Sequence, residues 1–146
     1  MRKIFILSLL ASLSALTLTL AAQTGGSFKV VVHRSNPVSQ MSGAEISRHF
    51  LKRTTRWPAG GKVLPIDQLP TSRVRIDFTN LVHRKNVNAV KSYWQAQLFS
   101  GTATPPPELP SDAEVLDYVR SHAGAIGYLS QSAAVGDGVK VVDVTG

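Results

Sequence analysis

The chain has 146 residues, a formal net charge of +7 and no cysteine. Without cysteine, disulfide bonds, thiol chemistry and a lipid-modified N-terminal cysteine are excluded, so an ordinary apolar core must stabilise the fold. The excess of basic over acidic side chains favours anionic partners such as phosphate or anionic polymers, but it says little about the fold.

Residues 1–22 have the pattern of a secretory signal peptide. Arg2 and Lys3 precede an apolar run over residues 4–20, and small residues follow from Ala21 onward. The alternative is a retained membrane anchor. However, the run is shorter than the roughly 20 apolar residues of a spanning helix, and serines and threonines interrupt it. We therefore expect cleavage, no stable membrane insertion afterwards, and a periplasmic or secreted protein.

Residues 23–146 are expected to form a single domain, because this length is close to the most common domain size. Removing the two basic residues of the leader lowers the formal net charge from +7 to +5.

The first half of this domain predicts a strand, a helix and a second strand. Residues 28–33 (FKVVVH) are rich in β-branched side chains, which favours a strand. Ser42 and Glu45 have the spacing of a capping box and predict a helix that runs to about Lys52. Residues 62–67 (KVLPID) predict a short strand whose proline marks a sheet edge or the end of the strand.

Two consecutive helices are predicted next, one from Ser72 and one after an Asn86 cap, because apolar residues recur at helical spacing. The expected apolar faces are Val74, Phe78, Leu81 and Val82 in the first helix, and Val87, Val90, Trp94, Leu98 and Phe99 in the second.

The C-terminal part predicts one more helix and two closing strands. Residues 101–110 contain four prolines and are expected to be an extended surface segment. Ser111 begins a helix with capping-box spacing, and Gly124 suits the left-handed position after its end. Residues 125–129 and 139–144 predict strands. Together the elements predict a three-layer α/β domain in which helices pack on a mixed sheet of four strands.

No catalytic motif stands out. There is no Gly-x-Ser-x-Gly elbow, and the acidic residues are scattered, so the chain is not expected to be an enzyme or to need a cofactor. The histidines lack the spacing of a zinc site, and we predict no metal. The basic residues that follow the first helix come without a nucleic-acid-binding motif, so nucleic acid is not an expected partner. The histidines are His33, His49, His83 and His122, and the basic residues are Arg48, Lys52, Arg53 and Arg56.

The helix start at Ser72 is the most promising place for a ligand. A helix N-terminus offers unpaired N–H groups and a partial positive charge, and Arg73 could bind a tetrahedral oxyanion through two hydrogen bonds. The alternative is simple capping, in which Ser72 satisfies its own helix while Arg73 and Arg75 point into water.

Six segments in chain order resemble the phosphate-binding proteins of ABC importers. They are FKVVVH, SGAEISRHFL, RTTRWPAGG, KVLPID, DFTNLV and HAGAIGYL. The resemblance is to one lobe of the two-lobed type II periplasmic-binding fold, with its mixed sheet between helices.

The resemblance also implies a site. Members of that family hold phosphate with an Arg and a Ser-Gly-Thr run at the helix start after the second strand of this lobe. Here the region reads QLPTSRVRIDF. Ser72 matches the family serine, Gln68 stands roughly where the ligand-binding Arg would be, and Arg73 replaces the glycine. The implied ligand-binding residues are therefore Gln68, Thr71, Ser72 and Arg73, with Arg73 supplying the charge that is missing at Gln68.

Two hypotheses follow. The protein is either an exported phosphate- or oxyanion-binding component of phosphate transport or sensing, or an envelope interaction module that reuses the lobe without binding a solute. In the first case, a second copy or another protein would supply the missing lobe.

Overall fold

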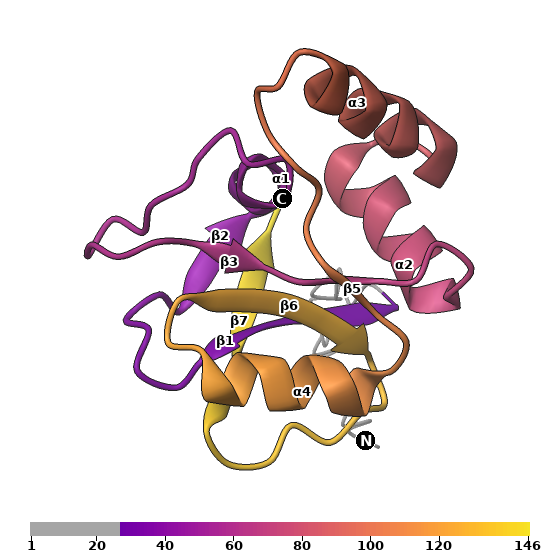
Figure 1. The fold of residues 1–146 in the computed structure, drawn as a ribbon. Helices are drawn as coiled ribbons and strands as arrows, with labels where there is room; N and C mark the ends of the chain where they lie inside the picture. Colours follow the sequence, from indigo (N-terminus) through magenta and orange to yellow (C-terminus); the bar gives the residue numbers. More distant parts are fainter. Residues whose placement is uncertain (1–26) are drawn as a thin grey trace, which may run out of the picture.

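The computed structural model describes residues 27–146, so the predicted signal peptide lies outside the described residues. The chain forms a five-stranded sheet, a separate two-stranded pair and four α-helices (Figure 1). The strands are β1 (Phe28–His33), β2 (Gln40–Ser42), β3 (Leu64–Pro65), β4 (Asp67–Gln68), β5 (Glu108–Leu109), β6 (Ala125–Ser130) and β7 (Val139–Thr145). The helices are α1 (Gly43–Phe50), α2 (Arg73–Phe78), the π-helix η1 (Thr79–His83), α3 (Val87–Phe99) and α4 (Asp112–Ser121).

The large sheet is mixed, as predicted, and has the strand order β2-β7-β1-β6-β3. The central strand β1 pairs antiparallel with both β6 and β7, while the edge strands β2 and β3 pair in parallel with their neighbours. Pro65 lies in the edge strand β3, where a residue without an N–H group is tolerated. The prediction missed β2, a strand of only three residues that extends the sheet beyond β7.

Apolar side chains cover both faces of the sheet, which confirms the three-layer arrangement. In β1, Val30 and Val32 belong to the core that contains Phe50, whereas Val31 belongs to the core that contains Val115. This alternation is expected for a strand buried on both faces. Helix α4 therefore covers one face of the sheet, and α1 and α2 lie on the other (Figure 1).

The predicted capping residues explain three of the helix starts. Ser42 and Glu45 form a complete capping box, in which the Ser42 hydroxyl accepts from the Glu45 N–H and the Glu45 carboxylate accepts from the Ser42 N–H. The Asn86 side chain accepts from the Ala89 N–H at 2.8 Å and begins α3. Ser111 accepts from the Glu114 N–H at 3.2 Å and begins α4.

The predicted apolar faces of the two middle helices are partly wrong. Leu81, Leu98 and Phe99 are 56%, 52% and 92% exposed. The first helix does not continue as an α-helix but changes to the π-helix η1, whose wider turn moves the buried face onto Thr79, Val82 and His83. Helix α3 packs through Val90 and Trp94, and its end, with the two exposed apolar residues, projects beyond this contact.

Gly124 does not occupy the predicted left-handed position, since α4 ends at Ser121 and the left-handed glycines lie elsewhere among the described residues. Glycine at this position allows the turn before β6 to approach the backbone of Lys62 closely. A Cβ atom at this position would lie 2.2 Å from the carbonyl oxygen of Lys62, so only glycine fits beside β3. The predicted strand 62–67 is also divided, because β3 joins the large sheet while β4 pairs with β5.

None of the helices within residues 27–146 combines the length and the apolar character that crossing a membrane requires.

Candidate functional site

The start of α2 is the only α-helix start among the described residues that has no side-chain cap. Ser72 has the extended backbone of an N-cap residue, but its hydroxyl donates to Gln68 Oε1 at 3.0 Å instead of accepting from the helix. The alternative in which Ser72 caps its own helix is therefore wrong. The first N–H groups of α2 have no side-chain partner.

Gln68 accepts the hydrogen bond of the Ser72 hydroxyl and is itself held by the protein interior. Its side chain is buried, and Nε2 donates to Asp112 Oδ1 at 2.8 Å and to the Tyr128 carbonyl at 3.1 Å. All of these contacts lie inside the protein, so Gln68 positions the Ser72 hydroxyl and does not itself face the solvent. The structure thus brings the side chains of Gln68 and Ser72 together.

Arg75 does not point into water, which corrects the capping alternative for this residue, whereas Arg73 is exposed as that alternative expects. Arg75 is 4% exposed. Its Nη1 lies 2.6 Å from Asp67 Oδ1 and donates to the Gln68 carbonyl at 2.9 Å, while Nε donates to Thr79 Oγ1 at 3.1 Å. A buried guanidinium with these partners fixes the first turn of α2 against β4.

Asp67 completes this buried network. The Tyr128 hydroxyl donates to the same carboxylate oxygen that pairs with Arg75. Burial raises the pKa of Asp67 to about 6, against the opposing effects of the Arg75 charge and the Tyr128 hydrogen bond. Burial also raises the pKa of Tyr128, which keeps its hydroxyl protonated as a donor. No sequence pattern predicted this network, because Tyr128 lies 61 positions from Asp67 and only packing brings the two together.

Thr71 and Arg73 lie on the outside of the same turn and are exposed. The Arg73 side chain is 85% exposed, and its Nε lies 3.2 Å from Asp77 Oδ1, one helical turn further along. An exposed pair of this kind is weak, and its side chains exchange partners readily. Little free energy therefore holds the guanidinium at Asp77.

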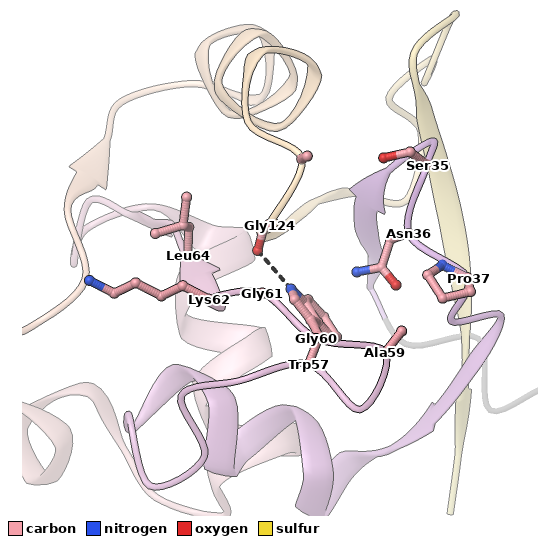
Figure 2. Close-up of a pocket in the computed structure, with 11 residues that line it drawn as sticks. Ser35, Asn36, Pro37, Trp57, Ala59, Gly60, Gly61, Lys62, Leu64 and Gly124 are labelled. Carbon is pink, nitrogen blue, oxygen red and sulfur yellow. Dashed lines mark hydrogen bonds between the residues drawn. The ribbon is translucent and has the colours of Figure 1, made fainter.

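Of the pockets in residues 27–146, one lies apart from this region and another reaches Arg75. One of about 480 Å³ is enclosed by the turn after β1, the loop that carries Trp57 and the turn before β6 (Figure 2). There the Trp57 indole N–H donates to the Gly124 carbonyl at 3.0 Å, as drawn in Figure 2. The other pocket, of about 400 Å³, lies beside α3 and is lined by Arg75, Trp94 and Glu108 among others.

Solved structures of phosphate-binding proteins share this fold. The chain superposes on an ABC-type phosphate transport receptor from Vibrio cholerae with a TM-score of 0.64 at 16% identity, and on PstS from Borrelia burgdorferi with 0.63 at 11%. A substrate-binding protein with bound phosphate from Clostridium perfringens, assigned to phosphate ABC transport, gives 0.58 at 20%.

These matches cover 82% of this chain but only 46%, 47% and 45% of the three structures, respectively. The chain thus spans less than half the length of the proteins it superposes on, and it has the fold of a single lobe. The sequence matches no protein-family model. It matches no curated protein either.

Proposed function

We propose that this chain is an exported protein that binds phosphate or a similar oxyanion at the start of α2, as a component of phosphate transport or sensing. The observation that carries the proposal is the uncapped helix start. Its N–H groups have no side-chain partner, whereas the other three α-helices are capped. The likeness of the fold to phosphate-binding lobes supports the same assignment.

Four residues would form the site. Thr71 offers a hydroxyl group at the helix start, and the exposed Arg73 offers a guanidinium once it leaves Asp77. The Ser72 hydroxyl donates its one proton to Gln68 and must give up that bond before it can donate to the ion. Gln68 acts indirectly, because its buried side chain holds the Ser72 hydroxyl in place. No covalent chemistry is required of these residues, in keeping with a binding protein rather than an enzyme.

The affinity of a single lobe should be weak. One side of the ion faces water, where the high dielectric constant and dissolved salt reduce the strength of each charge-assisted hydrogen bond. Tighter binding would need an opposite wall, supplied by a second copy or by another protein.

Thermal-shift titration of the mature protein with phosphate and with sulfate tests this function, since a ligand that binds the folded state raises the melting temperature. We expect a rise at millimolar phosphate that Arg73→Ala abolishes. Arg56→Ala, which removes the same charge from a separate loop, should leave it nearly unchanged. Equal losses would indicate diffuse attraction, and no response of the wild type even at low salt would refute oxyanion binding.

Export is tested separately by mass spectrometry of the protein recovered from cells. A mature N-terminus near Gln23 supports it, whereas an intact Met1 in the membrane fraction contradicts it.

One observation favours the second candidate function, an envelope interaction module. Phe99 is almost fully exposed at the end of α3, and Leu98 beside it is half exposed. Adjacent exposed apolar side chains are typical of protein interaction sites. If phosphate and sulfate have no effect and Phe99→Ser abolishes self-association in sedimentation experiments, this function replaces the first.

A further inference from the structure

The pocket beside Trp57 is lined by a largely buried side chain, that of Asn36, whose amide nitrogen makes no hydrogen bond within the described residues. Asn36, in the turn after β1, is 6% exposed and lines this pocket of about 480 Å³. Its Oδ1 accepts from the Val38 N–H at 3.0 Å. This bond fixes the orientation of the amide, because the reversed orientation would place two donors against each other.

The other end of the amide faces the pocket. Figure 2 shows the Asn36 nitrogen pointing across the open space toward Trp57 and Gly124. Within residues 27–146, this nitrogen makes no hydrogen bond, and it is open to solvent, because every fully buried side-chain nitrogen or oxygen there has a partner. Water in the pocket can satisfy this donor, and a ligand that brings an acceptor can take the place of that water.

The other residues that line the pocket indicate which chemical groups the rest of the ligand should carry. Trp57, Pro37 and Leu64 provide apolar surface, and the indole is held in place by its bond to Gly124. Gly60 and Gly61, with φ of 100° and 87°, carry no side chain, so their peptide groups line the pocket directly. No acidic side chain is among the lining residues, so nothing in the pocket repels an anionic acceptor.

We propose that this pocket binds a small molecule through a carbonyl oxygen, either a carboxylate or an amide, that accepts from Asn36 while an apolar body packs on Trp57. The volume lies in the range of small-molecule sites, which combine mostly apolar walls with a few polar groups. The pocket shares no residue with the oxyanion site at α2, so the two proposals can fail independently.

Three probes of similar size test the proposed chemistry. Benzoate and benzamide carry the carbonyl acceptor in its charged and neutral forms, whereas benzylamine has none. In ¹⁵N-labelled wild-type protein, the first two should shift the side-chain amide signals of Asn36 and the indole signal of Trp57. Dissociation constants of the order of 1 mM are expected for fragments of this size. Equal binding of benzylamine, or shifts confined to other residues, would overturn the proposal.

Asn36→Asp separates ligand binding from folding. The aspartate keeps an oxygen for the Val38 N–H, replaces the donor that faces the pocket by an acceptor and adds a negative charge, so the neutral benzamide is the decisive probe. We expect at least tenfold weaker binding of both benzoate and benzamide. Asn88→Asp makes the same change in the pocket beside α3 and should leave binding unchanged. Unchanged benzamide binding by Asn36→Asp would show that the Asn36 amide is not the recognition group. Because the oxyanion site lies elsewhere, titration of this variant with phosphate should give the same thermal shift as the wild type.

Discussion

At the scale of single residues, close approach and burial decide which amino acid is tolerated. Gly124 lies against the Lys62 carbonyl, and Arg75 is enclosed by Asp67, Gln68 and Thr79. Neither requirement can be read from neighbouring sequence, because the contacting groups belong to other elements.

Gly124→Ala should destabilise the protein by about 2 kcal/mol or more, because the new methyl group would overlap a backbone oxygen that cannot turn aside. Urea unfolding followed by circular dichroism measures the change. Gly43→Ala is the matched control. Its Cβ meets no atom within 4 Å and it lies at the first position of α1, so it should be neutral or slightly stabilising. Equal effects at the two positions would contradict this explanation of Gly124.

At the scale of elements, α3 shows that helical periodicity predicts a helix better than it predicts which side chains are buried. The helix forms where expected and begins at Asn86, yet it packs only through Val90, Trp94 and their neighbours. The face that continues to Leu98 and Phe99 meets solvent.

Trp94→Ala should therefore cost about 3 kcal/mol of the free energy of unfolding, because it empties the small core between α3 and Leu51. Phe99→Ala should change it by less than about 0.5 kcal/mol in the monomer. The same urea experiment, done at low protein concentration, compares the two variants. A large loss for Phe99→Ala at low concentration would mean that this side chain is buried within the monomer after all.

At the scale of the whole molecule, two buried titratable groups give opposite dependences of stability on pH. Burial raises the pKa of Asp67 to about 6 from 3.8, so its contribution to stability is present below about pH 4 and is lost as pH rises to 6. Burial lowers the pKa of His83 to about 4 from 6.5, so its contribution is lost as pH falls through the same interval. Burial also lowers the pKa of His49, so the contribution of this residue to stability is likewise lost as pH falls.

In the wild type the slopes from Asp67 and His83 offset each other, so the unfolding free energy should rise only slightly between pH 4 and 6, through His49. Asp67→Asn should make stability increase with pH relative to the wild type in this range, and His83→Gln should make it decrease. Urea unfolding at several pH values gives these slopes even though both variants lower the overall stability. Parallel profiles for all three proteins would show that neither group titrates differently on folding.

The local features of this protein could be predicted from its amino-acid sequence. The sequence predicted the β-branched strand β1, the capped starts of α1, α3 and α4, the edge position of Pro65 and the class of the fold. These features follow from conformational propensities and from hydrogen bonds within a few residues, so they depend only on the local sequence.

Only the tertiary structure decided the short strand pairs, the buried network and the pocket. The pairing of β4 with β5 and the hydrogen bond from Tyr128 to Asp67 join segments far apart in the chain. The predicted helix start at Ser72 shows the limit most clearly, since its hydroxyl bonds to Gln68 instead of capping α2. A side chain with several possible partners takes the one that packing brings within reach, and packing depends on the whole chain.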